Sequence, residues 1–285
     1  MDRKKVTIPD LQAKKEAGQP ITMLTAYDYP TALLVDRAGI DILLVGDSLG
    51  MVVLGMPNTV AVTMKDMIHH CKAVSRGASS CLIVGDLPFM SYNVSTEKAM
   101  ENAGRLLKEG NADVVKLEGG REMAEVVRKL VDGGIPVQGH IGLTPQSATK
   151  LGGFKVQGKD VASARKLVDD AIALEQAGAF SLILEAVPDR LARIITETVK
   201  IPTIGIGAGP WCDGQVLVTH DMVGLFDRFT PKFVRKYANV YGEMMKAMES
   251  YKADVENRAF PGPEHGFTIK DEILDALKKE LGQQQ

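Results

Sequence analysis

Eight short apolar runs recur along this chain, and each is followed by a stretch with helical spacing or by a loop that leads to one. Such runs are typical of strands that are buried on both faces of a parallel sheet. They cover residues 22–28, 42–47, 81–86, 114–118, 137–142, 182–185, 203–207 and 215–220. Parallel strands that alternate with helices in this number predict a closed (β/α)8 barrel, a fold of the α/β class.

Glycines and prolines mark the boundaries between these elements. Gly39, Gly110 and Gly178 come shortly before the second, fourth and sixth strands, where a glycine ends the preceding helix. Pro136 and Pro202 introduce the fifth and seventh strands, where a proline removes no hydrogen bond from the sheet. The positions of these glycines and prolines support the assignment of alternating strands and helices in a barrel.

The alternation continues without a break, so we expect one domain over residues 1–285, with the barrel core at about 21–230. Before the first strand, residues 8–17 predict one helix that closes the bottom of the barrel. After the last strand we expect C-terminal helices over about 231–285. Within this extension, apolar residues at helical spacing between 232 and 257 predict one long helix or two shorter ones.

The balance of charges excludes some classes of partner. The chain has 34 basic and 36 acidic residues and a formal net charge of -2, so it lacks the basic footprint of a nucleic-acid-binding protein. No apolar run approaches the roughly 18 to 20 residues that a membrane-spanning helix needs. We therefore expect a cytoplasmic protein without a nucleic-acid or membrane partner.

Three carboxylates close three of the apolar runs. Asp47 ends the second, Asp86 the third and Glu118 the fourth. The carboxyl ends of parallel strands meet at one end of a barrel, which is where barrel enzymes build their active sites. We therefore expect these carboxylates to converge and to bind a divalent metal.

Further polar residues follow the other strands. This end of the barrel is predicted to carry Asp28, Asp47, Asp86, Glu118, His140, Glu185 and a glycine-rich loop at residues 205–209. Any one carboxylate at a strand end can instead cap the next helix, and a glycine-rich turn can bind an anion or only shape a pocket. The number of such groups nevertheless favours an active site.

Oxygen ligands indicate the kind of metal. Mg²⁺ prefers oxygen atoms in octahedral geometry and usually keeps several waters. Two or three carboxylates together with a chelating substrate therefore suit Mg²⁺ or a similar divalent ion better than they suit zinc.

Lys116 and Glu185 are candidates for substrate binding and for general-base catalysis. Lys116 stands two residues before Glu118 on the same strand, so both side chains point into the barrel. Neighbouring carboxylates should keep Lys116 charged, which suits an anionic substrate group and opposes a Schiff-base role. Glu185 closes the sixth run and could act as a general base if its apolar surroundings raise its pKa.

Several motifs together are similar to those of one known family. They occupy residues 46–50 (Gly-Asp-Ser-Leu-Gly), 85–89 (Gly-Asp-Leu-Pro-Phe), 116–120 (Lys-Leu-Glu-Gly-Gly), 139–146 (Gly-His-Ile-Gly-Leu-Thr-Pro-Gln), 205–209 (Gly-Ile-Gly-Ala-Gly) and 213–215 (Asp-Gly-Gln). In this order and spacing, from about residue 21 to residue 267, the chain resembles the ketopantoate hydroxymethyltransferase family.

The resemblance implies a TIM barrel related to the phosphoenolpyruvate mutase and isocitrate lyase group. It also implies a homodecamer of two five-membered rings, a pentamer of dimers. The expected reaction transfers a hydroxymethyl group from 5,10-methylenetetrahydrofolate to 3-methyl-2-oxobutanoate and gives 2-dehydropantoate through a metal-stabilised enolate. This reaction is the first committed step of pantothenate biosynthesis, and Mg²⁺ is the expected cofactor.

Site roles also follow from the resemblance. Asp47, Asp86 and Glu118 match the metal-binding positions, directly or through water, and Glu185 matches the proton acceptor. The substrate-binding positions are matched by Asp47, Ser48, Asp86 and Lys116.

Two alternatives remain open. One is another metal-dependent C–C lyase or mutase of the related barrel group that acts on a different 2-oxo acid. The other is a barrel without catalysis that serves as a metabolite-binding or assembly protein. Such a barrel is expected to have lost at least one carboxylate at this end, whereas all four are present.

Overall fold

The computed structural model describes residues 3–149, 152–226 and 229–282. Eight parallel strands pair in sequence order, and the last pairs with the first, so the sheet is a closed barrel. The strands are β1 (Ile21–Thr25), β2 (Ile42–Val45), β3 (Leu82–Asp86), β4 (Val114–Glu118), β5 (Val137–Gly142), β6 (Ser181–Glu185), β7 (Thr203–Ile206) and β8 (Gly214–Leu217). The predicted fold class is confirmed.

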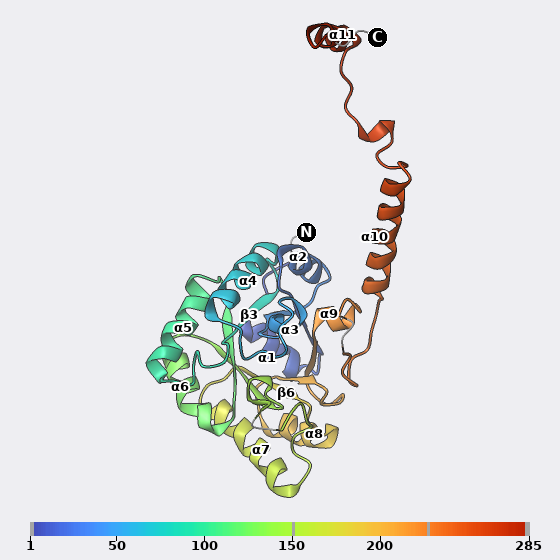
Figure 1. The fold of residues 1–285 in the computed structure, drawn as a ribbon. Helices are drawn as coiled ribbons and strands as arrows, with labels where there is room; N and C mark the ends of the chain where they lie inside the picture. The colour runs from blue at the N-terminus through green and yellow to red at the C-terminus, as the bar shows by residue number, and fades with distance from the viewer. Residues whose placement is uncertain (1–2, 150–151, 227–228, 283–285) are drawn as a thin grey trace. The chain divides into compact units, whose positions relative to one another are not determined.

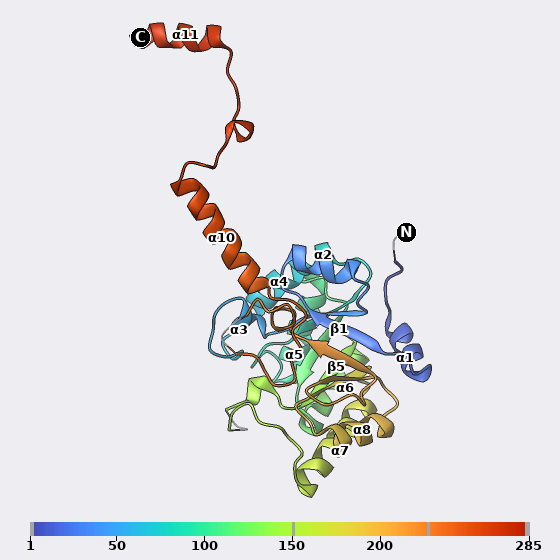
Figure 2. The same ribbon diagram turned by 90° about the vertical axis from the view of Figure 1, so that its right-hand side faces the viewer.

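Helices surround the barrel (Figures 1 and 2). The longer ones are α2 (Tyr29–Arg37), α4 (Met64–Gly77), α5 (Thr96–Lys108), α6 (Ala124–Asp132), α7 (Val161–Gln176) and α8 (Asp189–Thr198). The short elements are α3 (Leu49–Val52), η1 (Arg121–Met123), η2 (Pro145–Ser147) and α9 (Thr219–Met222). A loop joins β7 to β8, and within the described residues of unit Met1–Ala238 the short α9 is the helix that follows β8. A hollow of about 910 Å³ therefore lies beside β1 and β8.

The core has two layers because successive strand residues point to opposite faces. On β2, Leu43 and Val45 pack with the surrounding helices, whereas Ile42 and Leu44 belong to an inner cluster inside the barrel. Helix α1 (Ile8–Glu16) contributes Leu11 to this inner cluster, as expected of a helix that closes the barrel.

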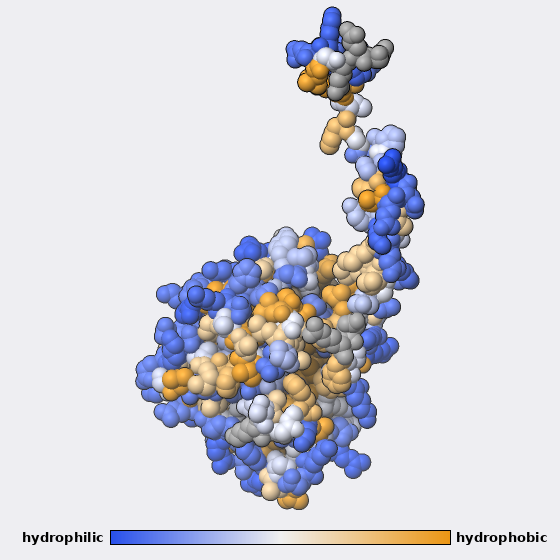
Figure 3. All heavy atoms as spheres, viewed as in Figure 1, coloured by the Kyte–Doolittle hydropathy of each residue, from blue (hydrophilic) through white to orange (hydrophobic). Residues whose placement is uncertain are grey.

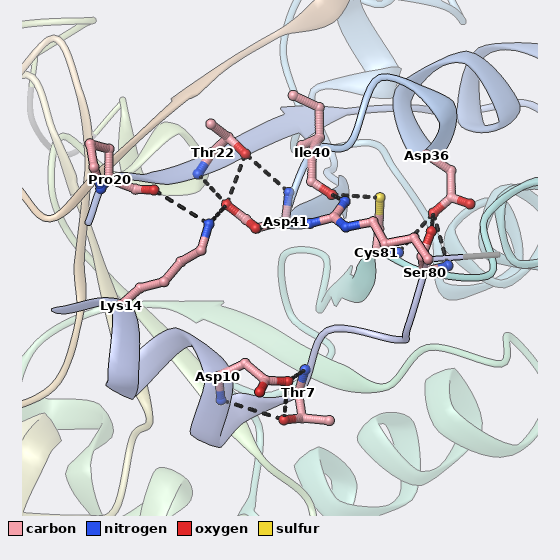
Figure 4. Close-up of polar contacts among 11 residues, drawn as sticks. Thr7, Asp10, Lys14, Pro20, Thr22, Asp36, Ile40, Asp41, Ser80 and Cys81 are labelled. Atoms are coloured by element: carbon pink, nitrogen blue, oxygen red, sulfur yellow. Dashed lines mark hydrogen bonds and ion pairs between the residues drawn. The ribbon is translucent and has the colours of Figure 1, made fainter. Parts of the chain in front are cut away.

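Ion pairs hold the N-terminal segment to the amino end of the barrel (Figure 4). Asp41, Asp113 and Asp213 directly precede β2, β4 and β8. Each accepts a hydrogen bond from a backbone N–H of the preceding strand and pairs with a lysine of the N-terminal segment. The donors are Thr22 and Lys14 for Asp41, Ile83 and Lys5 for Asp113, and Thr203 and Lys15 for Asp213, at 2.7–2.9 Å.

The predicted ends of the first and eighth strands were wrong. The first strand ends at Thr25 instead of residue 28, because Asp28 is the N-cap of α2 and accepts a hydrogen bond from the Thr31 N–H. The eighth strand ends at Leu217, and His220 lies in α9.

The helix expected from residue 232 begins only at Val240. The preceding backbone makes other hydrogen bonds, since the Tyr237 N–H donates to the Met222 carbonyl and the Val234 N–H to the Pro231 carbonyl. Asn239 then caps the helix through its side chain.

The chain divides into two compact units, Met1–Ala238 and Asn239–Gln285. The second contains α10 (Val240–Glu256), η3 (Pro263–His265) and α11 (Asp271–Glu280), and its described residues are not buried. Across the described ranges of both units, the helices lack the length and apolar character needed to cross a membrane.

Candidate active site

Polar side chains from the ends of five strands line one cavity at the carboxyl end of the barrel. The cavity has a volume of about 360 Å³. Its polar lining includes Asp47, Asp86, Lys116, Glu118, His140 and Glu185. Hydrophilic side chains cover the outer helices of the barrel unit, while hydrophobic ones gather nearer its centre, about α3 (Figure 3).

The register of the sheet brings these groups together. Asp86 on β3 lies opposite Lys116 on β4, and Glu118 lies opposite His140 on β5. Lys116 and Glu118 share the inner face because they are two residues apart. Five of the six charged or ionisable groups predicted at this end are thus brought together, and Asp28 is the exception because it caps α2.

Lys116 is paired with Asp86. Its Nζ donates to both carboxylate oxygens of Asp86, at 2.9 and 2.8 Å, and lies 3.6 Å from Glu118 Oε1. Burial alone would lower the pKa of Lys116, but Asp86, Glu118 and Asp47 outweigh this effect and raise the pKa above its ordinary value. Lys116 therefore remains an ammonium ion at neutral pH.

The carboxylates carry more negative charge than this lysine balances. Burial, followed by repulsion from Asp86 and Glu118, raises the pKa of Asp47 well above its ordinary value. Burial likewise raises the pKa of Glu118 to about 8 despite the nearby Lys116. Such a site favours the uptake of protons or of a cation.

Glu185 faces the same cavity from β6. Burial raises its pKa to about 7, although Lys116 opposes the shift. His140 Nε2 lies 3.3 Å from Glu185 Oε2, and His140 Nδ1 lies 3.6 Å from Glu118 Oε1. Burial and the charge of Lys116 lower the pKa of His140 well below 6.5, so the imidazole is neutral at pH 7. A carboxylate with a pKa near neutrality is suited to general-base catalysis.

Ser48 and the glycine-rich loop complete the lining. Ser48 lies at the start of α3, and its Oγ is 2.8 Å from the hydroxyl of the buried Tyr27. Gly207 has a φ of 63°, and a Cβ placed there would lie 2.7 Å from the ring of Phe233. The close approach of Phe233 to Gly207 favours a role of this loop in shaping the pocket over one in binding an anion.

The donor set can be tested for its fit to a metal. In the part of the chain that the structure describes, no three His, Cys, Asp or Glu side chains form a complete metal-binding group. Three carboxylates nonetheless point into one cavity, and Glu118 Oε1 is buried without a hydrogen-bond partner. Mg²⁺ commonly takes only one or two protein carboxylates and completes its shell with water and substrate oxygens. The residues therefore fit such an ion.

Two residues of the site were not predicted to have a role. Gln146 N–H donates to Glu118 Oε2, and its side chain donates to Asp47 Oδ2. The hydroxyl of Tyr92 lies 2.7 Å from Gln146 Oε1. Gln146 stands in one of the resemblance motifs, but a neutral residue in a loop has no periodic pattern that indicates its contacts.

The closed barrel defines an α/β-barrel protein, and the carboxylates at its carboxyl end make a candidate acid–base site. Solved structures of similar fold include a phosphonopyruvate hydrolase, with a TM-score of 0.61, 11% identity, and 98% of this chain and 97% of that chain covered. Another is 2,3-dimethylmalate lyase, a member of the PEP mutase/isocitrate lyase superfamily, with a TM-score of 0.59, 15% identity and coverage of 97% and 98%. At these identities the likeness concerns the fold alone.

The sequence comparisons define the family. A model of the family described as ketopantoate hydroxymethyltransferase matches residues 5–263, and the chain belongs to this family. It is 58% identical to the 3-methyl-2-oxobutanoate hydroxymethyltransferase of Syntrophomonas wolfei subsp. wolfei, over 96% of this chain and 99% of that protein. It is 60% identical to the protein of the same name from Moorella thermoacetica, over 93% and 98%.

Proposed function

We propose that this chain is an enzyme that transfers a hydroxymethyl group to 3-methyl-2-oxobutanoate and forms 2-dehydropantoate, at the start of pantothenate biosynthesis. The proposed one-carbon donor is 5,10-methylenetetrahydrofolate. One observation carries the proposal: a chain of this family holds Glu185 and Lys116 on a single cavity with Asp47, Asp86 and Glu118.

Substrate binding follows from the fixed charges. The ammonium group of Lys116 is held by Asp86 and can attract the carboxylate or keto oxygen of a 2-oxo acid. The Ser48 hydroxyl, beside the Tyr27 hydroxyl, can donate a second hydrogen bond to the substrate. Apolar residues such as Leu44, Ile183 and Ile206 also line the cavity and suit the two methyl groups of the substrate.

Glu185 is proposed to remove the proton from C3. In its ionised form the carboxylate accepts this proton, and an enolate of the substrate remains. His140 Nε2 lies 3.3 Å from Glu185 Oε2 without a hydrogen bond between them, and a small movement of the ring would let Nε2–H donate to the base. The enolate carbon then forms a bond to the methylene carbon, which is at the oxidation level of formaldehyde, and water supplies the hydroxyl oxygen. The two C–N bonds of this carbon to N5 and N10 break, and tetrahydrofolate leaves with the former C3 proton and one proton of the water. C3 becomes quaternary and cannot lose a proton again.

Asp47 and Asp86, with Glu118 directly or through water, are proposed to hold Mg²⁺ or another divalent ion. When bound, such an ion supplies positive charge that stabilises the negative charge developing on the substrate oxygens. The excess of buried carboxylates supports this assignment, because a cation would balance them.

Proton NMR of 3-methyl-2-oxobutanoate in D₂O tests the proposal. With the protein and Mg²⁺, the C3 proton signal should disappear, and EDTA should stop its loss. Addition of 5,10-methylenetetrahydrofolate should then give 2-dehydropantoate. Folded, metal-loaded protein that gives neither exchange nor product would exclude this function and return attention to a lyase, a mutase or a binding protein.

The resemblance to the family also leads us to propose a cytoplasmic location and a homodecamer of two five-membered rings. Sedimentation equilibrium at several protein concentrations tests the assembly. A mass of ten times the 30.8 kDa of one chain is expected. A stable monomer or dimer would exclude the ring.

A further inference from the structure

We infer that Gln146 is a positioning residue that holds two of the proposed metal-binding carboxylates in place. The inference rests on the proposed function, because it concerns the same site. It concerns a neutral side chain to which neither the sequence pattern nor the resemblance gave a role.

Gln146 contacts two carboxylates from different strands. Its backbone N–H donates to Glu118 Oε2 at 3.0 Å, and its side-chain Nε2 donates to Asp47 Oδ2 at 2.9 Å. Nε2 also donates to the Leu87 carbonyl at 3.0 Å. Gln146 is only 4% exposed, so water cannot readily replace these hydrogen bonds.

The partners fix the direction of the amide. Both the Asp47 carboxylate and the Leu87 carbonyl are acceptors, so the nitrogen of the amide must face them and its oxygen must face Tyr92. The Glu118 N–H donates to the Tyr92 oxygen at 3.2 Å, and the Tyr92 hydroxyl then donates to Gln146 Oε1 at 2.7 Å. An oriented chain of hydrogen bonds thus runs from Glu118 through Tyr92 and Gln146 to Asp47.

This chain leaves specific oxygens for a ligand. Gln146 takes Asp47 Oδ2 and Glu118 Oε2, and among the described residues no donor bonds Asp47 Oδ1 or Glu118 Oε1. One oxygen of each carboxylate is therefore held, while the other accepts no hydrogen bond from the described residues; Glu118 Oε1 lies 3.6 Å from both Lys116 Nζ and His140 Nδ1. Hydrogen bonds to the side chains that bind a metal orient those side chains, and their loss typically lowers metal affinity about 10- to 100-fold.

Gln146→Met tests the inference because methionine keeps the length of the side chain but removes its three hydrogen bonds, to Asp47, Leu87 and Tyr92. The backbone N–H that donates to Glu118 remains, so the variant tests the hold on Asp47.

Gln138→Met is the matched control. Gln138, on β5, is also a buried glutamine; its Nε2 donates to Ser181 Oγ, and among the described residues no hydrogen bond joins it to a carboxylate of the site. Tyr92→Phe is a second variant that retains Gln146 and removes the hydroxyl that orients it.

The first readout is binding of Mn²⁺, followed by the electron paramagnetic resonance signal of the free ion. Gln146→Met should raise the dissociation constant about 10- to 100-fold, and Tyr92→Phe should raise it less. Gln138→Met should leave it within about twofold of the wild type, because this change removes a buried hydrogen bond without touching a ligand. Far-UV circular dichroism confirms that each variant is folded.

The second readout separates positioning from a direct catalytic role. At saturating Mn²⁺, the C3 exchange rate of Gln146→Met should return to within a few-fold of the wild-type rate. The metal concentration required for half of this rate should rise in parallel with the dissociation constant.

The outcomes distinguish this inference from the proposed function. Suppose that the wild type binds Mn²⁺ and exchanges the C3 proton, and that folded Gln146→Met and Tyr92→Phe bind Mn²⁺ with the wild-type affinity. This result would overturn the positioning role and leave the proposed function intact. An equal loss of affinity in Gln138→Met would show a general effect of core damage and would also overturn it. A wild-type protein that neither binds Mn²⁺ nor exchanges the C3 proton would overturn the proposed function as well.

Discussion

Buried carboxylates lie at both ends of the barrel, but they differ in their partners. At the amino end, Asp41 accepts hydrogen bonds from Lys14 and from both the backbone and the side chain of Thr22, and it pairs with Arg3. Burial alone would raise the pKa of Asp41, but the hydrogen bonds and the charge of Lys14 outweigh it and lower the pKa. The ionised form is therefore stabilised by folding.

At the carboxyl end the balance is reversed. Asp47 and Glu118 are buried and Glu185 is mostly so, all with too few donors, and the pKa of each is raised. Folding therefore disfavours their ionised forms. The difference indicates that the amino end stabilises the closed barrel, whereas the carboxyl end maintains a set of charges that only a ligand or a proton can balance. Four predictions test this division, from the largest expected effect to the smallest.

Glu185→Gln should abolish activity without weakening the fold. Glutamine keeps the shape of the side chain but cannot accept the C3 proton, so the exchange rate should fall about 100- to 10,000-fold. NMR in D₂O measures the rate, and titration of the substrate in the presence of Mg²⁺ should show that binding persists. Unchanged exchange in this variant would remove Glu185 from the role of base.

Asp41→Asn should lower the stability of the fold and leave the activity unchanged. It leaves Lys14 and Arg3 without a buried anionic partner and should lower the free energy of unfolding by about 2–3 kcal/mol. Urea unfolding gives this value, while the C3 exchange rate of the folded variant should stay within twofold of the wild type. A large loss of exchange with unchanged stability would contradict the division between the two ends.

The sequence was sufficient to predict features that depend on local pattern. Asp47, Asp86 and Glu118 could be placed at one end because each closes an apolar run, and parallel strands bring such positions together. Local pattern also misled at Asp28, since a carboxylate at a strand end and one that caps a helix look alike in sequence.

Features that depend on closure of the barrel could not be predicted. Lys14 and Asp41 are 27 residues apart, and Lys15 and Asp213 are 198 apart, so no periodicity connects them. The contact of Gln146 with Asp47 spans 99 residues and involves a neutral side chain. The register of the closed sheet, which sequence spacing does not specify, determines these pairs.

Without a divalent metal, the stability of the protein should fall as the pH rises from 6.5 to 8. In the folded state Glu118, with a pKa of about 8, and Glu185, with a pKa of about 7, retain protons that the unfolded chain has already released. The folded state thus binds more protons, so the free energy of unfolding decreases, by about 1–2 kcal/mol over this interval.

Urea unfolding at pH 6.5 and pH 8 with EDTA measures this change. The lowered pKa of Asp41 adds no slope in this interval, because that group is ionised in both states above its ordinary pKa. Glu185→Gln should reduce the slope, and Mg²⁺ should stabilise the wild type more at pH 8 than at pH 6.5. A stability that rises with pH would mean that the carboxyl end is not short of positive charge.

The last prediction concerns the pH dependence of the C3 exchange rate, which should distinguish Glu185 as the base from the neighbouring carboxylates. If Glu185 with its pKa of about 7 is the base, the C3 exchange rate should be constant above pH 8 and fall about tenfold per pH unit below pH 6, because the protonated carboxyl cannot accept a proton. Metal binding also weakens as carboxylates are protonated, so the rates must be measured at saturating Mn²⁺, checked by titration at each pH. Under those conditions the fall should remain in Gln146→Met, whose defect is in metal affinity. A rate that stays constant down to pH 5 would assign proton removal to a group with a lower pKa than that of Glu185.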